Sequence, residues 1–312
     1  MAIQRVKLND FLVFKGKFAA DFVEDGVNVL IGENGTGKST LLKCLYGLKW
    51  THSRLYDKDN YALNDAKGYA LYVNNPIAGI QSHEWGNATI GRALRNFVYI
   101  PEKDILEHAN GLMTFIRTKQ TGFSLIYEDV LLAAQDVPTK NQTENQKEMG
   151  KKIADIIGGH IEWVPSEGSF YTIRTDGTRI PFANEASGFR KFGFLGLLIA
   201  CGQLGPDTVL FWDEPENSLN PELVPKLVDI LLELSRNGVQ IFIATHSELL
   251  ASYFAVNRKK GDKVMFMSLY KDGEEIKANT GDRFDLLEPN NLTAEPVKLY
   301  EKEIERGLGG NE

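Results

Sequence analysis

One eight-residue run constrains this chain more than any other feature. Residues 32–39 read GENGTGKS and satisfy the pattern GxxxxGK[ST]. The run follows an apolar stretch at 27–31 and precedes a stretch with helical apolar spacing at 39–48. A strand that is apolar on both faces belongs inside a parallel sheet, so the setting is strand, glycine-rich loop and helix. The sequence therefore predicts an α/β fold with a phosphate loop at residues 32–39.

The chemistry of the phosphate loop follows from its residue types. Glycines at 32, 35 and 37 allow a backbone curl whose N–H groups, with the helix N-terminus, point at phosphate oxygens. Lys38 is predicted to reach the β- and γ-phosphates, Ser39 to offer its hydroxyl to Mg²⁺, and Thr40 to contact the α-phosphate side. The predicted nucleotide-binding residues are Gly32, Asn34, Gly35, Thr36, Gly37, Lys38, Ser39 and Thr40. The expected cofactors are ATP and Mg²⁺.

Two consecutive carboxylates supply the second part of the predicted site. Asp213 ends the apolar run 208–212, so its side chain is expected at the carboxyl edge of the sheet, where ligands of such folds bind. There it is predicted to hold Mg²⁺ together with Ser39. Glu214 is predicted to polarise the water that attacks the γ-phosphate. Such a pair alone is equally compatible with a helix cap, but its occurrence together with the phosphate loop favours catalysis.

These residues carry a family resemblance. The run FWDEPENSLNP from Phe211 resembles the segment of ABC-type ATPases in which a glutamate follows the metal-binding aspartate. The next predicted strand ends in IATHS, where His246 is similar to that family's switch histidine. The resemblance implies a P-loop NTPase in which His246 senses the γ-phosphate, with a cap or core role as the alternative. It covers residues 1–48 and about 182–270 well, and the middle of the chain only loosely.

The family's signature loop is expected upstream of Asp213, at the start of a helix. Residues 186–191 read ASGFRK and occupy that place. The resemblance implies that Ser187 and Gly188 present a helix N-terminus to the γ-phosphate bound by a second subunit. The run departs from the LSGGQ pattern of transporters and looks closer to soluble ABC ATPases related to the overcoming-lysogenization-defect, RecF and SMC groups. A plain N-cap is the alternative role.

Two parts of the family's site have no direct match. The glutamine expected after the predicted strand 97–100 is absent, and Pro-Glu-Lys occupies positions 101–103. Glu102 is therefore a candidate to replace that glutamine near the metal and the attacking water. Phe11 and Phe14 precede the phosphate loop and are candidates to stack on adenine, with core packing as the alternative.

The order of the predicted elements indicates one ABC-type ATPase domain over residues 1–312. Alternating strands and helices predict a parallel sheet, and an antiparallel part precedes the phosphate loop, so the fold class is α/β with a mixed sheet. Residues 50–182 are expected to form an inserted, mainly helical subdomain with a hairpin at 176–177. A C-terminal helix is predicted at 292–309, with an apolar stripe that packs on the body or on a partner.

Composition limits the surroundings of the protein. A net charge of −7 disfavours broad nucleic-acid binding and leaves only a local basic patch at 258–263. The longest apolar stretches fall short of the ~20 residues of a membrane span, and no signal-peptide pattern is present, so no membrane contact and a cytoplasmic location are expected. Cys44 and Cys201 lie in apolar runs and are expected to be core residues.

Three functional settings are compatible with this site. The favoured one is a regulatory or motor ATPase that closes as a head-to-tail homodimer on ATP and acts with a separate effector protein. The resemblance places such proteins in bacterial anti-phage defence and DNA maintenance. The alternatives are the nucleotide-binding subunit of a transporter and an ATP-binding interaction module with little turnover. The degenerate signature and the missing glutamine count against the transporter.

Overall fold

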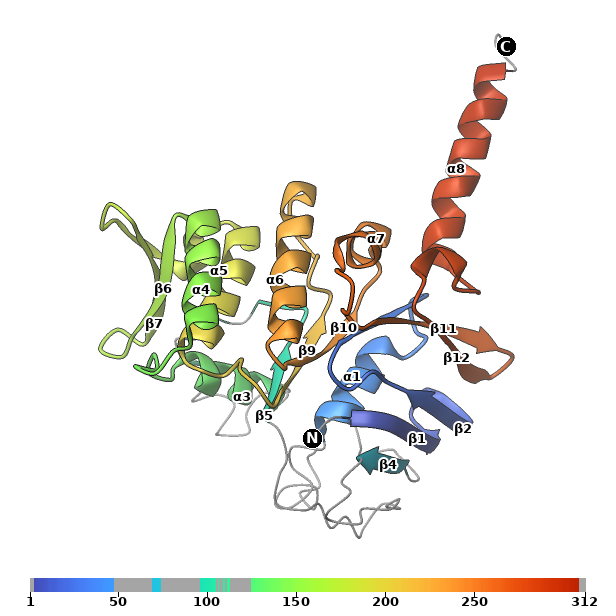
Figure 1. Cartoon of the computed structure of the whole chain (residues 1–312), viewed down its shortest axis with the longest axis horizontal. Coiled ribbons are helices and arrows are strands. Elements are labelled where there is room, and N and C mark those ends of the chain that lie inside the picture. Colours follow the sequence, from blue (N-terminus) through green and yellow to red (C-terminus); the bar gives the residue numbers. More distant parts are fainter. Residues whose placement is uncertain are drawn as a thin grey trace.

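The structure of the chain, a computed structural model, describes residues 3–47, 69–73, 96–104, 106, 109, 111–112 and 125–308. Within these ranges the elements surround one central sheet (Figure 1). A small antiparallel sheet lies on one side of the central sheet, and a lobe of helices and strands lies on the other. The apolar spacing of residues 103–118 is typical of a helix, but most of these residues lie outside the described ranges.

The central sheet has six strands in the order β12-β11-β3-β10-β9-β5. Its strands are β3 (Val27–Gly32), β5 (Asn96–Ile100), β9 (Thr208–Asp213), β10 (Gln240–Ala244), β11 (Val264–Asp272) and β12 (Glu275–Gly281). Only β12 pairs in the antiparallel sense, with β11, so the sheet is mixed as predicted. Because β3, β9 and β10 are covered on both faces, they are buried along their whole length.

The small sheet precedes the phosphate loop and has the order β2-β1-β4, with antiparallel pairs. Its strands are β1 (Ile3–Phe11), β2 (Phe14–Asp21) and β4 (Tyr69–Val73). The buried amide of Gln240 accepts from the Ile3 N–H at 2.9 Å and donates to the Ile3 carbonyl at 2.7 Å, which ties β1 to β10. Phe11 and Phe14 are fully buried, so they pack in the core and offer no ring face to an adenine base.

Helices pack on the two faces of the central sheet, around the strand that precedes the phosphate loop. They are α1 (Lys38–Tyr46), α6 (Val224–Arg236) and α7 (Glu248–Asn257). The start of α6 is set by Asn220, whose side chain accepts from the Glu222 N–H at 3.3 Å, and by a short 3₁₀ turn, η4 (Pro221–Leu223). Its end is set by Gly238, at φ +86°.

The lobe beyond β5 combines helices with a second antiparallel sheet, β6-β7-β8. Its elements are α3 (Leu125–Ala134), α4 (Glu144–Ile157), β6 (Gly159–Val164), β7 (Ser169–Arg174), β8 (Arg179–Pro181), η3 (Phe182–Asn184) and α5 (Ser187–Ala200). In its described part, the range 50–182 is therefore mixed, not mainly helical. Strands β4 and β5 of the same range belong to the other two sheets. The predicted hairpin at 176–177 joins β7 to β8.

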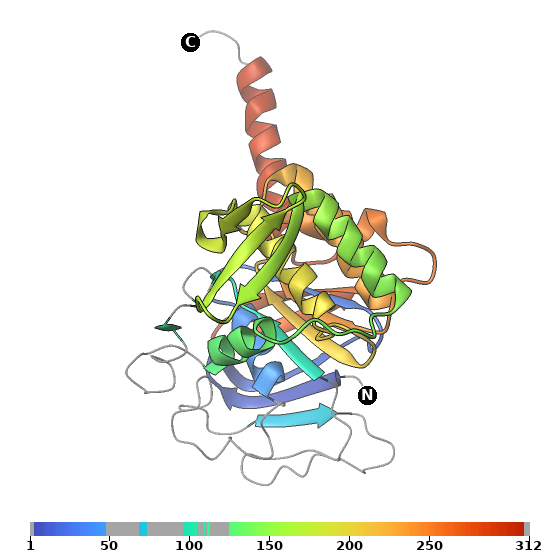
Figure 2. The same cartoon turned by 90° about the vertical axis from the view of Figure 1, so that its left-hand side faces the viewer.

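The chain continues after β12 through a 3₁₀ turn, η5 (Phe284–Leu286), into the last helix, α8 (Asn291–Leu308). In both views α8 stands away from the body (Figures 1 and 2). Its base is held by the buried Asn290, which donates to the Phe284 carbonyl at 3.0 Å. The helix expected at 292–309 is thus present, but its apolar stripe does not pack on the described body.

Two further expectations concern the core and the membrane. Cys44 and Cys201 are both buried free thiols. Burial raises the pKa of the Cys44 thiol to about 12 and that of Cys201 to about 11. Among the helices in the described ranges, none is both long and apolar enough to cross a bilayer.

Candidate nucleotide-binding and hydrolysis site

The phosphate loop joins β3 to α1 and is shaped by glycines. Gly32, Gly35 and Gly37 have φ of +141°, +78° and +90°, which glycine adopts without steric cost. At Gly37 a Cβ would also lie 2.7 Å from a methyl of Val13 and 2.8 Å from the Phe14 ring. No side chain caps the first turn of α1, so its N–H groups remain available to an anion.

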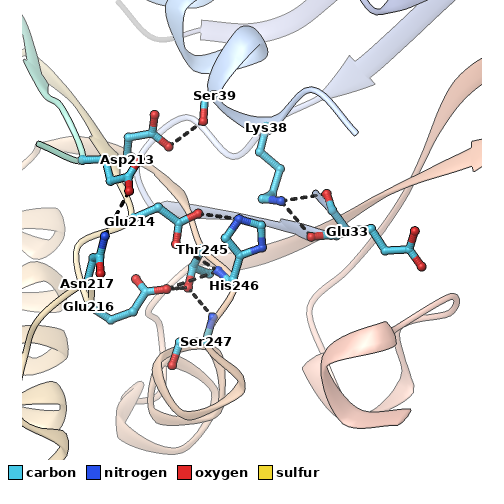
Figure 3. Close-up of polar contacts among 12 residues, drawn as sticks. Glu33, Lys38, Ser39, Asp213, Glu214, Glu216, Asn217, Thr245, His246 and Ser247 are labelled. Atoms are coloured by element: carbon cyan, nitrogen blue, oxygen red, sulfur yellow. Dashed lines mark hydrogen bonds and ion pairs between the residues drawn. The ribbon is translucent and has the colours of Figure 1, made fainter. Parts of the chain in front are cut away.

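Lys38 is folded back onto the loop that it follows. Its Nζ donates to the carbonyls of Gly32 at 2.7 Å and Glu33 at 3.0 Å (Figure 3). Burial lowers the pKa of Lys38, while the nearby carboxylates, Glu214 foremost, act in the opposite sense. The ammonium therefore rests on backbone carbonyls that a phosphate oxygen can replace. Thr36 is buried and braces the same turn, since its hydroxyl donates to the Glu33 carbonyl at 2.8 Å.

The predicted metal ligands meet at the edge of the sheet. The Ser39 hydroxyl donates to Oδ1 of Asp213 at 2.8 Å (Figure 3). Tyr99, from β5, donates to Oδ2 of the same carboxylate at 3.2 Å. Burial raises the pKa of Asp213, and the hydrogen bonds from Ser39 and Tyr99 oppose that rise. A hydroxyl and a carboxylate side by side are oxygen donors of the kind that Mg²⁺ prefers, so these residues fit the ion.

Glu214 follows with a strained backbone, at φ +49°. Its Oε1 lies 2.9 Å from Nε2 of His246 (Figure 3). Burial raises the pKa of Glu214 to about 8, and Glu216 contributes in the same direction. Burial lowers the pKa of His246. Burial therefore acts against the charged form of both groups, and Glu214 and His246 lie within hydrogen-bond distance of each other.

Glu216 is a member of this cluster that sequence reasoning missed. Its Oε1 accepts from the Thr245 hydroxyl and, at 3.2 Å, from the backbone N–H of His246 (Figure 3). It therefore links the loop after β9 to the loop after β10. Its signal in the sequence was its place in the run DEPEN, two residues after Glu214.

An open cleft of about 730 Å³ brings most of the predicted site together. Its described lining is Asn34, Gly35, Gly37, Lys38, Ser39, Thr40, Glu102, Glu214, Glu216, Asn217, Ser218, His246 and Ser247. Glu102 faces this cleft and accepts from the Asn217 amide at 3.0 Å. The signature candidates Ser187 and Gly188 are not part of that described lining.

The signature candidates instead begin α5, next to the loop that follows Glu214. The N-cap of α5 is Ala186, so Ser187 is the first helical residue and not a cap. Its hydroxyl donates to the Ser218 carbonyl at 3.1 Å. One turn further, Lys191 donates to the carbonyls of Glu214 and Pro215, both at 3.1 Å. Burial lowers the pKa of Lys191 to about 8.

A mixed sheet with a glycine-rich phosphate loop, a Ser-Asp pair and a glutamate beside it defines a P-loop nucleotide-binding protein of the ABC type. Matches to known sequences name the family. The glutamate transport ATP-binding protein GluA of Corynebacterium glutamicum is 32% identical over 259 residues, which are 83% of this chain and 81% of that protein. The chain belongs to the ABC-type ATP-binding proteins.

Other comparisons agree on the class. Residues 101–252 match the family described as "AAA domain, putative AbiEii toxin, Type IV TA system", and residues 5–84 match an "AAA domain" family. The glutamine transport ATP-binding protein GlnQ of Bacillus subtilis is 23% identical over 81% of this chain and 80% of that protein. A crystal structure of the SmcHead bound to the C-winged helix domain of ScpA covers 92% of this chain and all of that one, with a TM-score of 0.56 and 15% identity. That likeness is one of fold.

Proposed function

We propose that this chain is a Mg²⁺-dependent ATPase that closes as a head-to-tail dimer and thereby regulates a separate effector protein. The observation that carries the proposal is the 2.8 Å contact between Ser39 and Asp213 beside the phosphate loop. Two oxygen donors next to a phosphate cradle suit a triphosphate with its metal ion. Bound Mg²⁺ supplies Lewis-acid stabilisation of charge on the phosphate oxygens.

The chain's own residues take separate roles in hydrolysis. The loop N–H groups and Lys38 hold the phosphates, for which Lys38 leaves its carbonyl partners. Glu214 accepts a proton from the attacking water, and a pKa of about 8 lies near the pH at which a general base works well. His246 orients the Glu214 carboxyl through their 2.9 Å contact. Glu102 stands at the cleft in place of the family's glutamine.

The start of α5 supports the dimer. No side chain caps that helix, so the N–H groups near Ser187 and Gly188 are available to an anion. These residues lie outside the described lining of the chain's own cleft. A γ-phosphate held by a second copy is the ligand that such a helix N-terminus suits. The same copy then contributes a phosphate loop to the opposite site.

The biological setting has two candidates. One matched family is described as a "putative AbiEii toxin" of a type IV toxin–antitoxin system. This match favours a regulatory ATPase in bacterial defence, within the cytoplasm. The transport ATP-binding proteins among the relatives favour a transporter subunit instead. A third option is an interaction module with little turnover. The net charge of −7 gives no support to broad nucleic-acid binding in any of them.

Two variants test the ATPase. Lys38→Ala is expected to abolish MgATP binding in calorimetry, whereas Glu214→Gln is expected to keep binding and to stop turnover. With ATP, Glu214→Gln is expected to shift from monomer to dimer in size-exclusion chromatography with light scattering. Turnover by the glutamine variant at the parent rate would show that Glu214 is not the base. Stable co-purification with a membrane protein would favour the transporter.

A further inference from the structure

The projecting helix α8 carries an uncovered apolar stripe. Val297, Tyr300 and Ile304 share one face at helical spacing, and they are 55%, 64% and 42% exposed. An isolated helix of 18 residues is marginally stable in water, because most helical stability comes from packing of an amphipathic face. The helix is about 27 Å long at 1.5 Å per residue, and it leaves the body at its base (Figures 1 and 2).

Acidic residues border the stripe on both sides. At 100° per residue, Glu301 flanks one side of the stripe and Glu303 flanks the other, while Glu305 and Lys298 lie further round the helix on the Glu301 side. All four are exposed. The basic residues Lys302 and Arg306 fall on the opposite face of the helix. The stripe is therefore apolar in the middle, with one carboxylate next to it on each side.

We propose that α8 is a docking helix for a separate protein that presents an apolar groove bordered by Lys and Arg. Charge favours this occupant over an antiparallel pair with a second copy of the chain. In such a pair like flanking positions face each other, so Glu301 and Glu303 would each lie near carboxylates of the other copy. A basic border removes that repulsion and adds complementary charge.

The base of α8 also touches the phosphate loop. The Asn291 amide donates to the Glu33 carboxylate, and the Ser268 hydroxyl donates to the Pro289 carbonyl just before the helix. The Glu33 carbonyl in turn accepts from Lys38 at 3.0 Å. When Lys38 turns to a phosphate, the Glu33 carbonyl loses this hydrogen bond. Nucleotide binding is therefore transmitted through Glu33 to Asn291 at the base of α8. This coupling rests on the proposed ATPase, whereas the docking does not.

The test places a photo-crosslinker on the stripe of the full chain. Benzoylphenylalanine at position 300 replaces one exposed aromatic with another, and the same group at 302, on the opposite face, is the control. After irradiation of the producing cells, position 300 is expected to give an adduct with a different protein, and position 302 is not. The captured protein is identified by mass spectrometry, and its binding is then measured with both components purified.

Variants then separate docking from coupling. Val297→Ser with Tyr300→Ser and Ile304→Ser is expected to weaken binding at least about tenfold, and Leu299→Ser on another face is expected to change it little. Binding is expected to fall as salt rises from about 0.1 M to about 0.5 M. Three outcomes would each overturn the docking. They are an adduct only with a second copy or with the chain's own body, no adduct at position 300, and an affinity that the triple change leaves unaffected.

The coupling is tested with MgATP. Addition of MgATP is expected to change the affinity of the captured protein for the parent chain, and Asn291→Ala is expected to remove that change. Docking to the nucleotide-free chain and MgATP binding by calorimetry are measured separately. An intact MgATP effect in Asn291→Ala would overturn the coupling alone. A parent chain that binds the captured protein but binds no MgATP would instead contradict the proposed ATPase function.

Discussion

The Ser39 hydroxyl donates to Asp213 at 2.8 Å across 174 positions of sequence. Ser39 lies in the first turn of α1, which follows β3, and Asp213 ends β9; β3 and β9 are not neighbours, because β10 lies between them. Their contact therefore depends on the correct pairing of all three strands. It is the relationship on which the proposed metal site depends.

Replacement of Asp213 by Asn separates the metal function from stability. The amide keeps an oxygen that accepts from Ser39 but lacks the charge that a cation needs, so turnover is expected to fall at least about 100-fold. Burial raises the pKa of Asp213, which means that the folded state disfavours the carboxylate. The melting temperature is therefore expected to stay the same or rise. A large drop on calorimetric melting would show that the carboxylate is mainly structural.

Lys191 is expected to position the catalytic loop. Lys191→Met keeps the length of the side chain but removes both donors to the carbonyls of Glu214 and Pro215. The strained backbone at Glu214 then loses its support, so kcat is expected to fall about tenfold or more with KM for ATP little changed. Lys191→Arg, which keeps a donor, is the matched control and is expected to recover part of the rate. An equal loss in both variants would contradict a positioning role.

Gly37 and Gly273 form a matched pair of left-handed glycines. Gly37→Ala adds strain at φ +90° and a Cβ within 2.8 Å of both Val13 and Phe14, so loss of nucleotide binding is expected with about 1–3 kcal/mol of destabilisation. Gly273→Ala, at φ +62° with open space around it, is expected to cost only the backbone strain of about 1 kcal/mol and to bind normally. Urea unfolding and calorimetric titration measure the two effects. Equal binding by both variants would show that the contact at Gly37 does not matter.

The two buried thiols provide a pH-dependent readout of folding. Burial raises the pKa of Cys44 to about 12 and that of Cys201 to about 11, so the reactive thiolates are scarce in the folded chain at pH 8. A thiol reagent is expected to label neither residue there until denaturant is added. Because an ordinary cysteine ionises near pH 8.5, the unfolded chain is expected to react quickly at the same pH. Fast labelling of the native chain would mean that the structure around Cys44 or Cys201 opens readily.

Much of the site was predictable because its chemistry is local in sequence. The phosphate loop is eight consecutive residues. Its glycines have positive φ values, which glycine adopts without steric cost, so the sequence pattern alone predicts the turn. The place of Asp213 and Glu214 at the edge of the sheet was predictable because the apolar run before them indicates a buried strand, and β9 ends at Asp213. Glu102 also faces the cleft, although its role remains a proposal.

The missed residues depend on register and tertiary packing instead. Tyr99 reaches Asp213 only because β5 pairs with β9 so that Tyr99 lies opposite Phe211. Lys191 reaches the loop after Glu214 only through the placement of α5. Strand β6 of the lobe was also missed, since its alternation is short and follows directly on the helical spacing of α4. No pattern within a single segment reports these distances.

The place of β3 in the central sheet has a consequence for synthesis. Its two neighbours are β10 and β11, which are made more than 200 residues later. A chain still growing on the ribosome holds the phosphate loop sequence early, yet the strand that supports it has no sheet to join. We therefore expect that a nascent chain cannot hold a nucleotide at this loop until β10 and β11 have been made.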